Sequence, residues 1–179
     1  MRALPVGVPK LMVTTLGGSD TSGYVGSSDM VIMPSVADIS GINRITRAVF
    51  RNAAGAICGM VEAAKANVRA TADEIGDGSE ESGRQLVAAT MFGNTTHAVD
   101  HARLLLEEAG YEVLVFHATG SGGKAMESLI DQRYFVGVLD LTTTEWADEL
   151  CEGVLSAGPG RLGAAARTGI PAVVTPGCL

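Results

Sequence analysis

The chain of 179 residues has few aromatic side chains and no long apolar run. Aromatic residues make up 4% of the sequence, and no stretch approaches the roughly 20 apolar residues that a membrane-spanning helix needs. Residues 1–10 contain two prolines and a glycine, and they have no apolar signal core. We therefore expect a soluble, cytoplasmic protein without a membrane partner.

Excess basic charge and a cysteine framework are also lacking. Thirteen Lys and Arg residues stand against 20 Asp and Glu residues, which gives a net charge of −7. A general nucleic-acid binder needs cations to neutralise phosphates, so we expect no direct nucleic-acid partner. Cys58, Cys151 and Cys178 are an odd number without metal-ligand spacing, and they predict neither disulfides nor a metal site.

Apolar strands alternate with helical patterns, and this order predicts parallel β-α units. We predict an α/β fold: a three-layer, doubly wound, Rossmann-like arrangement with a mostly parallel sheet of about six strands. A single domain is expected over residues 1–179, with a flexible acidic loop at about 71–84. The expected strands are 10–16, 29–33, 86–91, 112–116, 135–141 and 172–175, and the expected helices are 42–65, 95–109, 124–132, 145–152 and 160–168.

A glycine-rich turn, residues 118–123, joins an apolar strand to a helix and predicts an anion site. Glycines let the backbone approach a phosphate, and the N–H groups of the first helical turn point at it. The turn is not a Walker P-loop, because Ala118 and Ala125 replace the required glycine and hydroxyl. It does match Gly-x-Gly-x-x-Ala at Gly120, Gly122 and Ala125, with Asp140 placed for a ribose. The match is short in a glycine-rich chain.

The other predicted binding residues also follow strands. Ligands of doubly wound folds bind beyond the carboxyl ends of the strands, whereas helix capping alone also favours hydroxyls there. Lys124 is either a phosphate ligand or a solvated helix residue. The predicted set is Gly93, Thr95, Thr96, Thr119, Gly120, Ser121, Gly122, Gly123, Lys124, Asp140, Thr142, Thr143 and Thr144.

Residues 140–145 are a second candidate, because hydroxyls stand between two carboxylates. They could hold Mg²⁺ through water or bind a phosphate; alternatively, Thr142 or Thr144 caps a helix that starts with Glu145. Glu145 is the candidate general base by position. His117, which ends a strand beside the glycine turn, is the second candidate acid or base, or else an ordinary strand-end residue.

Two further patterns lie on expected helices. His97 and His101 are four residues apart, but they lack a third ligand and read as a surface pair. Gly55 and Gly59 lie on the apolar face of the helix at 42–65, which indicates close packing against a sheet or a partner subunit. A homo-oligomer is therefore expected.

Several contiguous motifs resemble one family. They are Pro9–Val13, Tyr24–Asp29, Asn52–Ile57, Thr90–Gly93, Gly110–Gly120 and Gly137–Glu145. The chain resembles uncharacterised bacterial and fungal proteins similar to the ATP-binding inhibitory region of the tomato mosaic virus resistance protein. The resemblance implies a region of two α/β lobes, of which this chain is the second, with the missing first lobe as a partner and ATP as the ligand.

Three hypotheses about function follow. The first is a nucleotide-binding domain that holds ATP, with Mg²⁺ as its companion ion, through the glycine-rich turns. The second is an enzyme that acts on a small phosphorylated or carboxylated metabolite, with Glu145 or His117 as acid or base. The third is a dimerising protein-interaction module, in which the loops merely cap helices.

Overall fold

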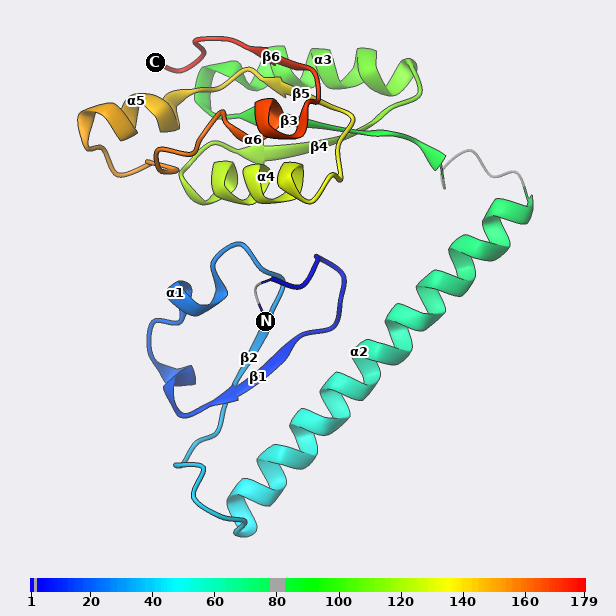
Figure 1. Ribbon diagram of the computed structural model, residues 1–179, viewed down its shortest axis with the longest axis vertical. Helices are drawn as coiled ribbons and strands as arrows, with labels where there is room; N and C mark the ends of the chain where they lie inside the picture. Colours follow the sequence, from blue (N-terminus) through cyan, green and yellow to red (C-terminus); the bar gives the residue numbers. More distant parts are fainter. Residues whose placement is uncertain (2, 78–82) are drawn as a thin grey trace. The chain divides into compact units, whose positions relative to one another are not determined.

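The computed structural model describes residues 1, 3–77 and 83–179, and it divides the chain into two compact units (Figure 1). The N-terminal unit is Met1–Ser82 and the C-terminal unit is Gly83–Leu179. The strands form two separate sheets, of two and four strands.

Within its described residues, the N-terminal unit has two parallel strands and three helical segments. Strand β1 (Leu11–Thr14) pairs with β2 (Val31–Pro34), with Leu11 opposite Val31. The connection carries a 3₁₀ turn, η1 (Thr15–Gly18), and the single-turn helix α1 (Ser22–Val25). Helix α2 (Arg44–Asp77) follows β2.

Helix α2 begins at a side-chain cap and runs further than the sequence pattern predicts. Asn43 Oδ1 accepts hydrogen bonds from the N–H groups of Ile45 and Thr46, at 2.9 and 3.0 Å, which satisfies donors that the first turn leaves free. The helix continues to Asp77, so residues 71–77 are helical and not part of a loop. The rest of the predicted acidic loop at 78–82 lies outside the described residues.

The C-terminal unit is a four-stranded parallel sheet. Its strands are β3 (Leu86–Met91), β4 (Glu112–His117), β5 (Gly137–Asp140) and β6 (Ala172–Val174), in the order β4-β3-β5-β6. All pairings are parallel. The predicted α/β class, the parallel pairing and the six strands are confirmed, although the strands are shared between two sheets.

Helices cover the sheet on both faces, as strands that are apolar on both sides require. Figure 1 shows α3 on one face and α4 and α6 on the other. The bounds are η3 (Gly93–Thr95), α3 (Thr96–Glu108), α4 (Ser121–Asp131), α5 (Thr144–Cys151) and α6 (Ala164–Thr168). The core lies between α4, α6 and the sheet, and consists of Ala88, Met126, Ile130, Phe135, Val138, Ala164 and Ala165. Within the described residues, no helix has the length and hydropathy to cross a membrane.

Candidate functional site

The loops that follow the four strands of the C-terminal unit meet at the carboxyl edge of the sheet. The Thr143 N–H donates to the Gly177 carbonyl at 3.0 Å, which joins the loops after β5 and β6. The Cys178 thiol donates to the Phe92 carbonyl at 3.0 Å, which joins the loops after β6 and β3. The loops therefore converge at the edge where ligands of doubly wound folds bind.

The strand order identifies the position on this edge where a crevice is expected. From β3 the chain moves outward to β4, and it then returns past β3 to β5. The order reverses between β3 and β5, and such a switch point separates the loops that follow the two strands. Here the two loops are residues 92–96, which follow β3, and residues 141–144, which follow β5.

Buried hydroxyl groups fill the floor of this switch point. The Thr90 hydroxyl donates to Asp140 Oδ1 at 2.6 Å, and the Thr142 N–H donates to the Thr90 oxygen at 3.0 Å. The Thr95 and Thr142 hydroxyl oxygens are 2.7 Å apart. Thr90 and Thr142 are fully buried, so this network ties β3 to β5 and the two loops above them.

A buried arginine stands beside the hydroxyl network. The Arg161 Nη2 donates to Asp140 Oδ1 at 2.8 Å, and its Nε donates to Glu145 Oε2 at 2.7 Å. The three side chains are between 0% and 3% exposed. Burial lowers the pKa of the Arg161 guanidinium, but the hydrogen bonds and charges of Asp140 and then Glu145 outweigh it and hold that pKa above its ordinary value. Arg161 is therefore a fixed positive charge that is held mainly by Asp140 and Glu145, with Glu127 Oε1 as a third partner 3.4 Å from its Nη1.

The same Glu145 carboxylate occupies the glycine turn. Its Oε1 accepts hydrogen bonds from the N–H groups of Gly120 and Gly123, at 2.6 and 2.9 Å. The sequence predicts an anion at these donors, and the anion bound there is a side chain of the protein itself. Helix α4 begins at Ser121, three residues before the predicted start, so Gly122 and Gly123 belong to its first turn.

Close packing explains the three glycines. Gly120 has φ +89°, a region that side-chain-bearing residues rarely adopt. A Cβ at Gly122 would lie 1.8 Å from the His117 carbonyl oxygen, and a Cβ at Gly123 would lie 2.0 Å from Glu145 Oε2. The glycine pattern therefore brings the α4 backbone against β4 and against the buried carboxylate.

Two donors of the turn are left over. Among the described residues, no acceptor is found for the N–H groups of Ser121 and Gly122. Ser121 is exposed and Gly122 is half-buried. Lys124 is exposed in the next turn of the helix. Glu145 lies on the inner side of the turn, where its carboxylate accepts from the Gly120 and Gly123 N–H groups.

Asp140 does not have the geometry of a dinucleotide fingerprint. In that motif the acid ends the strand next to the glycine-bearing strand, whereas here β3 separates β4 from β5. Asp140 is 2% exposed, and both of its carboxylate oxygens accept from Arg161. The same contacts leave Asp140 and Glu145 without a free oxygen for Mg²⁺. Among the described residues, no cluster of His, Cys, Asp and Glu side chains is suited to hold a metal ion.

The remaining predicted residues have structural contacts. Thr143, and not Thr142 or Thr144, is the N-cap residue of α5, and its hydroxyl donates to the Thr175 carbonyl at 3.0 Å. The Thr96 hydroxyl donates to the Gly93 carbonyl at 2.8 Å. The Thr119 N–H donates to the His117 carbonyl at 2.8 Å, and Thr119 itself is half-buried.

The two residues predicted as acid or base differ in accessibility. Glu145 is fully buried, and both of its oxygens are bound within the chain. His117 is exposed at the end of β4, and its ring meets Phe92 edge-to-face with the ring centroids 5.9 Å apart. A catalytic role for either residue stays a prediction.

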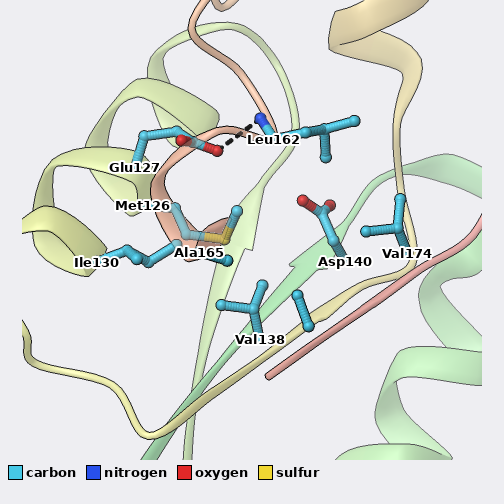
Figure 2. Close-up of a pocket in the computed structure, with 9 residues that line it drawn as sticks. Met126, Glu127, Ile130, Val138, Asp140, Leu162, Ala165 and Val174 are labelled. Atoms are coloured by element: carbon cyan, nitrogen blue, oxygen red, sulfur yellow. Dashed lines mark hydrogen bonds between the residues drawn. The ribbon is translucent and has the colours of Figure 1, made fainter. Parts of the chain in front are cut away.

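Glu127 on α4 holds the segment that carries Arg161. Its two carboxylate oxygens accept from the N–H groups of Leu162 and Ala164, each at 2.7 Å. Figure 2 shows Glu127 and Asp140 lining the same small cavity, together with apolar side chains such as Val138. Its volume of about 10 Å³ is no more than one water molecule needs, so it is not a ligand pocket.

Thr90, Glu127 and Arg161 complete the buried network, and none of them is among the residues predicted from the sequence. Thr90 is the one hydroxyl in the apolar strand β3, and Arg161 follows the turn Gly158-Pro159-Gly160. The available signal for Thr90 was its position as a polar residue within an apolar strand, together with the carboxylate of Asp140 at the end of a later strand. No local pattern marks Arg161, because its partners are 16 and 21 residues away in sequence.

Two family models match this chain. The C-terminal domain of an uncharacterised protein family, UPF0261, matches residues 84–179, and the N-terminal domain of the same family matches residues 1–66. These spans agree with the two structural units.

Relatives of the chain are considerably longer. A "UPF0261 protein" of Clostridium tetani is 53% identical over 180 residues, which cover 100% of this chain and 41% of the relative. A second relative, from Mesorhizobium japonicum, is 46% identical over 179 residues, which cover 100% of this chain and 42% of that relative. The tomato "ToMV resistance protein Tm-1(GCR237)" is 42% identical over 99% of this chain and 23% of its own length. The chain therefore spans at most about two fifths of these relatives.

Proposed function

The chain belongs to the uncharacterised protein family UPF0261, and from this premise we propose that its C-terminal unit binds the phosphate groups of a nucleotide, ATP, at the carboxyl edge of the sheet. The resemblance of the sequence motifs to an ATP-binding region favours ATP.

The observation that carries the proposal is the pair of unused donors at the start of α4. The N–H groups of Ser121 and Gly122 have no acceptor among the described residues. They stand at the positive end of a helix of 11 residues, where a phosphate is favoured by the dipole and by the free N–H groups together. Lys124 adds a positive charge one turn away.

The buried network determines which donors a phosphate uses. The Glu145 carboxylate already binds the inner donors Gly120 and Gly123, so the ligand takes the N–H groups of Ser121 and Gly122. This carboxylate also neutralises part of the α4 dipole, which makes the Lys124 charge the main electrostatic attraction. Weak binding with a strong dependence on Lys124 is therefore expected.

The nucleoside would extend from α4 toward the switch point between β3 and β5. Gly93 and Asn94 are exposed there, at the start of the 3₁₀ turn that precedes α3. Mg²⁺ would arrive with the phosphates, because Arg161 occupies the carboxylates of Asp140 and Glu145. The protein would then contribute position and charge, and the phosphates would hold the metal.

Thermal unfolding in the presence of Mg-ATP, Mg-ADP and inorganic triphosphate tests the proposal. A ligand at a hundredfold excess over its Kd stabilises the native state by about 2.7 kcal/mol. We expect an upward shift of the Trp146 fluorescence midpoint with Mg-ATP, and a smaller one with triphosphate. Equal shifts with both would mean that the site recognises phosphate and not the nucleoside.

Two variants locate the site. Lys124→Gln should abolish most of the shift, whereas Lys65→Gln removes the same charge from an exposed position on α2 and should leave the shift intact. A shift that Lys124→Gln does not reduce, or no shift with any of the three ligands, would contradict the proposal.

A further inference from the structure

The sheet of the C-terminal unit is covered unequally on its two faces. Helices α4 and α6 lie on one face, whereas α3 lies on the other (Figure 1). Helix α3 packs against β3 and β4. Strands lie about 4.8 Å apart and a helix is about 10 Å wide, so one helix covers about two strands. The α3 face therefore has room for one more helix, over β5 and β6.

A groove lies at that position. Its volume is about 450 Å³, and all ten residues that line it are apolar or glycine. Ala102, Leu105 and Leu106 form the α3 side, and Leu139 and Val173 belong to the strands. Leu105 is 54% exposed and Val173 is 59% exposed. Strands of a parallel sheet are normally buried on both faces, so this exposure is unusual.

The lining favours a helix as the occupant. Among the described residues, no charged or hydrogen-bonding side chain lines the groove, whereas a small-ligand site has a few polar groups that fix orientation. A groove bounded by one helix and floored by two strands matches the space beside α3 in a doubly wound fold. The face of an amphipathic helix supplies the matching apolar stripe.

The relatives provide a source for such a helix. The chain corresponds to 41% of the Clostridium tetani protein and to 42% of the Mesorhizobium japonicum protein. We propose that, in the full-length family protein, an amphipathic helix from outside these 179 residues docks in the groove between α3 and the β5–β6 strands, and completes the second helical layer of the C-terminal unit.

A pair of matched substitutions in two contexts tests the proposal. The first context is the 179-residue chain, and the second is a chimera in which these residues replace the matching 41% of the Clostridium tetani protein. Val173→Glu introduces a charge into the groove, and Val154→Glu introduces it at a side chain that is 96% exposed and outside the groove. In the chimera, Val173→Glu should lower the unfolding midpoint by about 5 °C or more. In the 179-residue chain it should change the midpoint little, and Val154→Glu should be silent in both.

Binding of an apolar dye gives a second readout that does not depend on stability. The 179-residue chain should bind the dye, Val173→Glu should reduce that binding, and the chimera should bind little. Equal destabilisation by Val173→Glu in both contexts would mean that the groove is already covered within the 179 residues, and would overturn the proposal. A dimeric 179-residue chain that Val173→Glu converts to a monomer would assign the groove to a second copy, and would overturn it as well.

Discussion

Within the part of the chain that the structure describes, each unit has one buried cation, and the surroundings of the two cations differ. In the N-terminal unit, Lys10 Nζ donates to the carbonyls of Pro5 and Val8, at 2.7 and 2.8 Å, and pairs with Asp29 at 2.6 Å. The Asp29 side chain is 37% exposed, so this pair reaches water. In the C-terminal unit, Arg161 and its partners Asp140 and Glu145 are at most 3% exposed.

The apolar core is also more extensive in the C-terminal unit than in the N-terminal unit. Among the side chains whose burial the structure describes, Met30 and Ala53 are the buried apolar ones of the N-terminal unit, and all others belong to the C-terminal unit. A two-stranded sheet is marginal by itself, whereas four strands packed between helices can be independently stable. The comparison shows that the fully buried ion pairs of Arg161 occur in the unit with the more extensive apolar core. Substitutions at matched positions can test this difference.

The largest effect is expected from Arg161→Leu. The change leaves Asp140 and Glu145 buried without their cation, and breaking a buried pair in this way costs about 3–5 kcal/mol. Arg167→Leu is the matched control, because Arg167 is 52% exposed and its partner Asp131 is 47% exposed; an exposed pair contributes at most about 1 kcal/mol. Urea unfolding followed by the fluorescence of Trp146 measures both. Equal effects would show that Arg161 is no more important than a surface arginine.

Next in size is the substitution of alanine for helical glycines in the two units. At Gly123 the added Cβ would lie 2.0 Å from Glu145 Oε2, and overpacking costs about 1–3 kcal/mol. At Gly55 in α2 no atom lies within 4 Å of the added Cβ, so alanine should stabilise the helix by about 0.5–1 kcal/mol. Unfolding curves of the two variants should move in opposite directions. A stabilising Gly123→Ala would contradict the contact with Glu145.

Lys10→Met should have a smaller effect than Arg161→Leu. The carbonyls of Pro5 and Val8 lose their donor, but the exposed Asp29 remains hydrated. We expect a loss of about 1.5 kcal/mol, the lower end for charged hydrogen bonds. Circular dichroism, to which the long helix α2 contributes most, follows the unfolding. Lys65→Met, at an exposed lysine of α2, is the control. A loss as large as that of Arg161→Leu would remove the contrast between the two cations.

The smallest effect on stability is expected from lowering the pH through the titration of Asp29. Burial raises the pKa of Asp29, but the hydrogen bonds from Lys10 and then the Gly7 N–H outweigh it, so the pKa is lowered from 3.8. A lowered native pKa stabilises the fold above the unfolded value, and that stabilisation is lost as the pH falls through the native value. Stability of the N-terminal unit should therefore decline below about pH 4. Asp29→Asn should flatten this decline in circular-dichroism titrations. An unchanged acid limb in Asp29→Asn would exclude this linkage.

The sequence by itself determined the α/β class and most of the elements. Apolar runs such as 86–91 and 112–116 coincide with β3 and β4 to within one residue, because burial on both faces of a parallel sheet requires continuous apolar side chains. The convergence of the loops after β3, β5 and β6 at one edge was also predictable, since parallel strands bring their carboxyl ends together. These features depend on local pattern and on general rules of chain topology.

Only the tertiary structure decided what the glycine turn binds. The sequence indicated an anion near Gly120 and Gly123, but it could not show that Glu145, more than 20 residues later, supplies it. Likewise, the Arg161 partners and the division into two sheets depend on contacts between residues far apart in the chain. The local sequence of a turn determines which N–H groups it offers as donors. The acceptor is the charged group that the tertiary fold buries beside the turn, and this group can lie far away in the sequence.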